Sequence, residues 1–329
     1  MTVSGGYGAA AIGGGNGAAN MQGDGNHIMI IRSKITAVGG SSGAGIGGGC
    51  QGNGSMIQIM DSEIQANSQQ YGAGIGGGNG GSGIDILISD SKVTCIGGEN
   101  GAGIGGGYQG NGEQITMEAA EVSATGGTHG AGIGGGSVGS AIDILISDQS
   151  KVYAWGGTMA AGIGSGNNMG MDPTWESESG TALQAVASQI QVTDSYVYAV
   201  GGSDGAGIGG GHFSYTEFLT FENAVIEASG GIYGAGIGGG NNGNASDIFC
   251  IDSQIYAQGG SLAAGLGGGF KGSVYRISAS GSTLDCQAGN DNYLKTDGIK
   301  GIGAGDQGNC YEVHIQDEPV EESLIEIGF

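Results

Sequence analysis

Apolar residues in this chain come in pairs separated by a single residue, and the pairs recur at a fixed spacing. The clearest pair is Ala44 and Ile46 in the string GAGIGGG, and the next three copies of this isoleucine follow at steps of 29 residues. The string or a degraded copy of it supplies these central aliphatic residues: Ile12, Ile46, Ile75, Ile104, Ile133, Ile163, Ile208, Ile237, Leu266 and Ile302. Apolar residues at every second position predict short strands with one buried face. A fixed period of this length indicates one structural unit stacked many times.

Each repeat contains two more apolar pairs, represented by Ile57 with Ile59 and by Ile64 with Ala66. Three strands per 29 residues predict a three-sided coil. In such a coil each strand pairs in parallel with its counterpart one turn away, ~4.8 Å along the axis. We therefore expect an all-β chain folded as a single-stranded parallel β-helix, or solenoid, of about ten turns. We assign a right-handed coil because parallel crossover connections are right-handed in nearly all proteins.

A single β-helix domain is expected to span residues 1–329, because the repeats run through almost the whole chain. Two segments break the period: an inserted loop at 167–187 and a distorted C-terminal cap at 289–329. In the cap, Lys300 takes a position that is an inward alanine in other repeats. Since the chain opens partway through a repeat, we expect it to be a module of a longer protein.

Glycine is the most unusual feature of the composition, with 80 glycines in 329 residues. Both neighbours of the core isoleucine in GAGIGGG are glycines, and these outward strand positions are expected to face solvent. The result would be a flat strip of bare main chain, bordered by polar and aromatic residues that include His129, His212 and Tyr233. This strip is a candidate cradle for an extended ligand. The alternative is that glycine allows tight stacking and the bordering residues are ordinary turns.

The insertion after Ile163 lies close in sequence to outward-facing rings. Tyr153 and Tyr198 share one outward column in consecutive turns, and Trp155 lies two residues from Tyr153. Aromatic faces suit stacking on the C–H faces of sugars, whose hydroxyls nearby carboxylates accept. The alternative is a loop that covers an exposed aromatic patch. The candidate ligand-binding residues are Tyr153, Trp155, Trp175, Tyr198, His129, His212 and Tyr233, and the carboxylates that a glycan-cleaving site would use are Asp172, Glu176, Glu178 and Asp204.

The charge balance narrows the range of partners. Acidic residues number 31 and basic residues eight, which gives a formal net charge of −23. Such a surface repels nucleic acid phosphates, so we expect no nucleic acid partner, while neutral and cationic partners stay open. We expect no membrane insertion, because the chain has no apolar run of about 18 residues. The five cysteines follow no metal-binding spacing, and no disulfide framework is expected.

A column of acidic residues follows the second strand of the repeats, with Asp61 and Asp90 among its members. Carboxylates stacked at ~4.8 Å repel one another. They therefore either accept hydrogen bonds from turn N–H groups or hold Ca²⁺, which prefers oxygen ligands. We expect turn residues and no resident cofactor, with calcium at Asp61 and Asp90 as the alternative.

Tandem GAGIGGG units followed by an IxIxDSxVxAxGG pattern resemble the Gly-rich repeats of bacterial surface and secreted proteins. These repeats are similar to the right-handed parallel β-helix (pectate-lyase-like) superfamily, whose members bind, cleave or isomerise polysaccharides. The resemblance implies a polysaccharide or oligosaccharide ligand and a location outside the cell or at the surface of a bacterium. It carries over no catalytic signature, so whether the chain is an enzyme stays open. We expect an adhesin-like module that binds a neutral glycan; the alternatives are a glycoside hydrolase or transferase with paired carboxylates, and a structural spacer. The oligomeric state is open.

Overall fold

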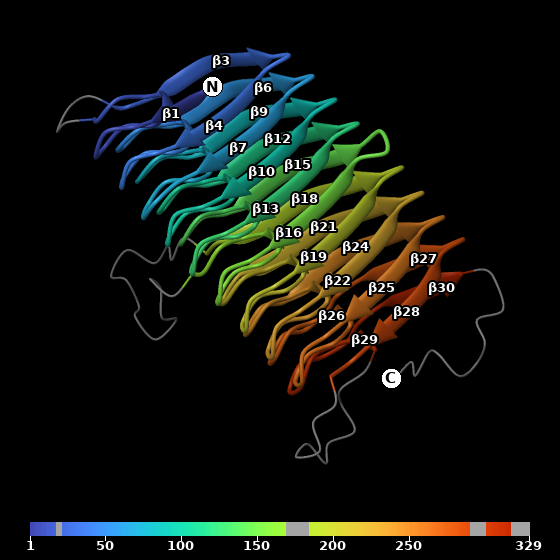
Figure 1. Cartoon of the computed structure of the whole chain (residues 1–329). Coiled ribbons are helices and arrows are strands. Elements are labelled where there is room, and N and C mark those ends of the chain that lie inside the picture. The colour runs from blue at the N-terminus through green and yellow to red at the C-terminus, as the bar shows by residue number, and fades with distance from the viewer. Residues whose placement is uncertain (18–21, 169–183, 290–300, 317–329) are drawn as a thin grey trace, which may run out of the picture.

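The computed structural model describes residues 1–17, 22–168, 184–289 and 301–316, and in this part every regular element is a β-strand. The strands form three parallel sheets of ten strands each, stacked along one axis. Figure 1 shows the equivalent strands of successive turns following one another from the blue N-terminal end to the red C-terminal end. The predicted parallel β-helix of about ten turns is thus confirmed. Its right-handedness stays a prediction based on the chirality of parallel crossovers.

Sheet 1 contains the first strand of the chain and its counterparts in later turns. Its outward positions carry three of the candidate aromatic residues, Tyr153, Trp155 and Tyr198. The strands of sheet 1 are β1 (Thr2–Ser4), β4 (Lys34–Val38), β7 (Glu63–Asn67), β10 (Lys92–Ile96), β13 (Glu121–Thr125), β16 (Lys151–Trp155), β19 (Tyr196–Val200), β22 (Val225–Ser229), β25 (Gln254–Gln258) and β28 (Thr283–Gln287).

Sheet 2 is built from the core aliphatic residue of each GAGIGGG string and the glycine that follows it. Its strands are β2 (Ile12–Gly13), β5 (Ile46–Gly47), β8 (Ile75–Gly76), β11 (Ile104–Gly105), β14 (Ile133–Gly134), β17 (Ile163–Gly164), β20 (Ile208–Gly209), β23 (Ile237–Gly238), β26 (Leu266–Gly267) and β29 (Ile302–Gly303). Ile104 pairs with Ile75 on one side and with Ile133 on the other, as the 29-residue period predicts.

Sheet 3 has the longest strands. They are β3 (Gly25–Ile31), β6 (Gly54–Met60), β9 (Gly83–Ser89), β12 (Gly112–Glu118), β15 (Ala141–Ser147), β18 (Val186–Thr193), β21 (Tyr215–Glu222), β24 (Ala245–Ile251), β27 (Ile277–Ser280) and β30 (Val313–Gln316).

The core consists of columns of aliphatic side chains that run along the axis. Ile57, Ile59 and Ile75 are fully buried, and each stacks on an equivalent residue one turn away. Burial of these ladders stabilises the coil at roughly 25 cal/mol per Å² of apolar surface. Where one column holds the bulky Phe221, its paired neighbours are the smaller Val192 and Cys250, so the column keeps its volume.

The predicted insertions fall largely outside the described residues. The loop candidates Asp172, Trp175, Glu176 and Glu178 lie in residues 169–183, which the structure does not describe, and Lys300 lies in the undescribed residues 290–300. The described residues contain no helix long and apolar enough to cross a membrane.

Candidate functional site

The glycines on both sides of the core aliphatic residues are buried in every turn between the two end turns, so the predicted solvent-facing strip of main chain is wrong. In the turn that contains Ile75, all of residues 72–78 are buried. The residues expected to border an open strip instead contact each other, because the Tyr108 N–H donates a hydrogen bond to the Tyr71 carbonyl at 2.7 Å. The equivalent bond recurs between other turns, for example from Asn241 N to Asp204 O. The glycines are therefore covered by neighbouring backbone, and the tight-stacking alternative holds.

The residues that meet over the glycines form a continuous ridge, which we call the closing ridge: the two residues before each GAGIGGG string and the one after it. It contains four of the predicted site residues, namely His129, Asp204, His212 and Tyr233. Asp204 and His212 flank the same string, whereas His129 and Tyr233 lie in other turns. Ridge neighbours contact three of them: His129 Nδ1 lies 3.1 Å from Asn100 Oδ1, Asp204 accepts a 2.6 Å hydrogen bond from Asn241, and the Tyr233 ring lies 5.6 Å from Phe270.

Asp204 and His212 are the two of these four that interact electrostatically. Partial burial lowers the pKa of His212, and the negative charge of Asp204 opposes this shift. The Asp204 carboxylate already accepts a hydrogen bond from Asn241, and the His212 imidazole beside it is partly buried. Both side chains can therefore be explained by packing within the ridge. Of the four predicted catalytic carboxylates, Asp204 is the one that lies in the described residues. The pairing of these carboxylates therefore stays a prediction.

A different surface gathers the aromatic residues. Tyr153 and Trp155 on β16 and Tyr196 and Tyr198 on β19 all point outward from sheet 1, since the alternating Val152, Ala154, Val197 and Ala199 are buried in the core. Four pairs of these rings are in contact, with centroids 5.9 to 6.5 Å apart, and Tyr153 takes part in three of the pairs. We call these four residues the aromatic cluster. The structure places Tyr153 directly opposite Tyr198, as the outward column predicts.

A groove of about 310 Å³ continues from the aromatic cluster toward the C-terminal end of sheet 1. Along one outward column it presents Tyr198, Glu227, Tyr256 and Asp285, and a second column adds Ser229, Gln258 and Gln287. None of these residues apart from Tyr198 is identified from the sequence. The repeat period is the signal in the sequence that could have revealed them, because it makes each of these residues the counterpart of Tyr198 or Val200 in a later turn.

One hydrogen bond joins the cluster to the groove. The Tyr196 hydroxyl donates to Glu227 Oε1 at 3.1 Å. Desolvation and then this hydrogen bond to the carboxylate raise the pKa of Tyr196 to about 12, so the phenol stays protonated and keeps donating at neutral pH. The bond holds the Glu227 carboxylate in place at one rim of the groove.

The acidic corner column has a backbone explanation. Asp61 and Asp90 adopt the left-handed conformation, with φ of 47° and 46°. Among residues with a side chain, aspartate and asparagine tolerate this conformation best, so the corner itself favours them. In the described residues, no group of three histidine, cysteine, aspartate or glutamate side chains gathers closely enough to hold a metal ion.

Comparison with known proteins identifies the repeat. A family model described as a beta helix repeat matches residues 57–79, 86–108, 115–137, 144–167 and 190–212. Each matched segment begins in a strand of sheet 3, continues through a strand of sheet 1 and the GAGIGGG string, and ends at the closing ridge. A search of curated proteins and a search of solved structures give no match.

Proposed function

We propose that this chain, a parallel β-helix built on beta helix repeats, binds a carbohydrate on the outer face of sheet 1. The observation that carries the proposal is the aromatic cluster of Tyr153, Trp155, Tyr196 and Tyr198 on two adjacent strands. All four residues are partly buried and keep part of their surface in contact with solvent. A contiguous group of large rings on the surface marks a binding site more often than chance exposure does.

The chemistry of the cluster suits sugar rings. Aromatic faces pack against the apolar C–H faces of sugars, while hydroxyl and amide groups nearby fix the orientation through hydrogen bonds. The tyrosine hydroxyls of the cluster and the amides of Gln258 and Gln287 in the groove supply both kinds of group. The cluster contains no acidic or basic side chain, so it contributes packing and hydrogen bonds rather than an ion pair.

The sheet also supplies rigidity. Residues 151–155 and 196–200 pair along their full length, and each inward side chain is locked in the core. Rings held on a rigid sheet lose little conformational freedom when a ligand binds, which favours affinity. We place the module outside a bacterial cell or at its surface, a proposal supported by the similarity of its repeats to those of bacterial surface proteins.

Glycan-array screening followed by calorimetry on the best ligand tests this function. Trp155→Ala and Tyr198→Ala should each weaken binding by at least about tenfold, since truncating an aromatic residue at the centre of a binding site typically removes 2 kcal/mol or more. Tyr7→Ala is the matched control, because Tyr7 is an exposed tyrosine at another part of the chain. Equal affinity for all three variants would refute the location.

Analysis of the bound glycan for released sugars separates the alternatives. Intact glycan after prolonged incubation supports a binding module, whereas shortened products would replace it with a glycoside hydrolase or transferase. Absence of binding across the array would leave the structural spacer as the better description.

A further inference from the structure

We propose that the groove beside the aromatic cluster binds a protonated amino sugar, so that the ligand is a linear glycan with free amino groups. The inference rests on the proposed carbohydrate function and adds the class of sugar. The apolar C–H faces of the glycan would pack on the aromatic cluster, and an ammonium group of the glycan would lie in the groove.

The first argument is the order of residues along the groove. Tyr198, Glu227, Tyr256 and Asp285 occupy equivalent outward positions on β19, β22, β25 and β28. Strands in a sheet lie ~4.8 Å apart, so Glu227 has a tyrosine one strand away on each side. Aromatic faces attract ammonium groups, and a carboxylate accepts their hydrogen bonds. Rings and carboxylates that alternate at this spacing therefore match an ammonium ligand.

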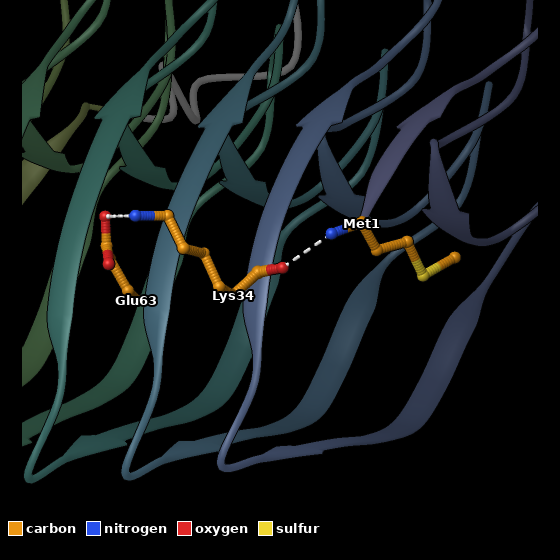
Figure 2. A network of polar contacts seen from close by, with 3 residues as sticks. All are labelled: Met1, Lys34 and Glu63. Carbon is orange, nitrogen blue, oxygen red and sulfur yellow. Dashed lines mark hydrogen bonds and ion pairs between the residues drawn. The ribbon is translucent and has the colours of Figure 1, made fainter.

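The second argument is the contrast with the N-terminal turns of the same sheet. There the outward glutamates have lysine partners: Lys34 Nζ lies 2.7 Å from Glu63, as Figure 2 shows, and Lys92 Nζ lies 2.6 Å from Glu121. The lining of the groove contains no lysine or arginine. Within the described part of the chain, Glu227 and Asp285 take part in no ion pair. Each accepts one hydrogen bond from an uncharged neighbour, Glu227 from Tyr196 and Asp285 from Gln287, and neither hydrogen bond supplies a positive charge to balance the carboxylate.

The third argument favours a sugar over a basic peptide as the source of that cation. Ser229, Gln258 and Gln287 line the groove beside the carboxylates and offer hydrogen bonds that sugar hydroxyls can use. The two carboxylates lie two strands apart, ~9.6 Å, which an extended disaccharide spans. The groove also continues directly into the aromatic cluster, because Tyr198 belongs to both. One glycan chain can therefore contact both surfaces.

Calorimetry with three β-1,4-linked oligomers of equal length tests the inference: glucosamine, N-acetylglucosamine and glucose. At about pH 6, where the glucosamine amines are largely protonated, the glucosamine oligomer should bind tightest. Glu227→Gln and Asp285→Asn should each weaken its binding by about tenfold or more, because hydrogen bonds to charged groups contribute most. The same substitutions should leave the two uncharged oligomers nearly unchanged. Glu63→Gln is the matched control, since Glu63 faces outward on the same sheet but is paired with Lys34.

Two outcomes overturn the inference while the proposed function stands. In the first, the uncharged oligomers bind as tightly as glucosamine and depend on Trp155 and Tyr198. In the second, the glucosamine oligomer binds tightest but Glu227→Gln and Asp285→Asn leave its affinity unchanged. If an oligolysine of equal charge competes as well as the glucosamine oligomer, the groove is a peptide site and the amino-sugar assignment fails. If none of the oligomers binds, the inference falls together with the carbohydrate function.

Discussion

At the scale of single residues, Gly76 is required for two independent reasons. Its φ of +130° is a conformation that residues with a side chain rarely adopt. A methyl group at this position would also collide with the carbonyl oxygen of Gly105 in the next turn. Gly80, in the same turn, has a positive φ of +78°, but a methyl group there would meet only Gln51 Cα, at an ordinary contact distance of 3.8 Å. A comparison of alanine substitutions at these two positions therefore distinguishes the cost of backbone strain from the cost of a steric collision.

Gly76→Ala should lower the free energy of unfolding by at least about 3 kcal/mol, because strain and overpacking add. Gly80→Ala should lower it by only about 1 kcal/mol, since the loss is backbone strain alone. The counterparts of Gly80 in adjacent turns, Gln51 and Gln109, already adopt similar φ angles of 56° and 60°. Chemical denaturation of both variants is the measurement. Equal losses would show that the Gly105 carbonyl moves aside freely.

A buried thiol gives the stability a pH dependence with a defined sign. Burial raises the pKa of Cys250 to about 12, whereas an unfolded cysteine titrates near 9. Below about pH 9 the thiol is neutral in both states and its contribution to stability is fully present. As the pH rises from about 9 to about 12, only the unfolded state ionises, so that contribution is lost.

Cys250→Ala should therefore flatten the decline in stability between about pH 8 and pH 10.5, relative to the unsubstituted chain. The absolute stability of this variant will be lower at every pH because a buried sulfur is removed. Denaturation midpoints across the pH series report the slope. Val192→Ala removes a buried side chain that does not titrate from the same column, so it should lower the stability and keep the original slope. A flattened slope in that control would contradict the assignment to the thiol.

At the scale of elements, the corner between sheet 3 and sheet 1 is held by a ladder of serines. The Ser33 N–H donates to Ser62 Oγ, and the Ser62 N–H donates to Ser91 Oγ, each at 3.0 Å. Ser62 and Ser91 hydroxyls in turn donate to the Met60 and Ser89 carbonyls of their own corners. The ladder thus gives the backbone N–H of a tight, partly buried corner an acceptor in the next turn.

Ser91→Ala should lower the free energy of unfolding by about 1 to 2 kcal/mol, because the buried Ser62 N–H loses its acceptor. Ser123→Ala is the control, since Ser123 points outward on β13 and should change stability by less than about 0.5 kcal/mol. Amide hydrogen exchange provides the sharper readout, because faster exchange should be confined to Ser62 and its neighbours. Uniform acceleration over all turns would contradict a local role.

The strands are predictable from the sequence, and the closing ridge is not. Ile57 and Ile59 reveal their strand because burial imposes an alternation that repeats in every turn. The bond from Tyr108 N to Tyr71 O leaves no such mark, because backbone atoms form it and the side chains there vary. Because these backbone bonds cannot be predicted from the side chains, the expectation that the strip of glycine main chain faces solvent is wrong. Three members of the aromatic cluster are predictable because Tyr153 and Tyr198 fall in one column and Trp155 lies two residues along the strand. Tyr196 and the groove are missed, because Tyr196, Glu227 and Asp285 belong to no local motif.

At the scale of the whole molecule, the coil is a quasi-one-dimensional stack in which each turn contacts the turns next to it. Sheets 1, 2 and 3 all pair every strand with its equivalents in neighbouring turns, and no described strand skips a turn. Stability in such a stack is close to a sum over turns and over the contacts between neighbours. Length can therefore change by whole turns without loss of the fold, provided that the register is kept.

Deletion of residues 86–114 tests this property, because it removes 29 residues and joins Asp85 to Ile115, the counterpart of Ile86. The shortened chain should keep its β-type circular dichroism and a cooperative unfolding transition, since every core column stays aligned. It should also keep its affinity for the glycan, because the aromatic cluster on β16 and β19 lies beyond the deletion. Deletion of residues 86–115 differs by one residue and would direct Thr116 into the core and Met117 outward in that strand. That chain should unfold at a markedly lower temperature or aggregate, and equal stability of the two deletions would show that the aliphatic columns do not set the register.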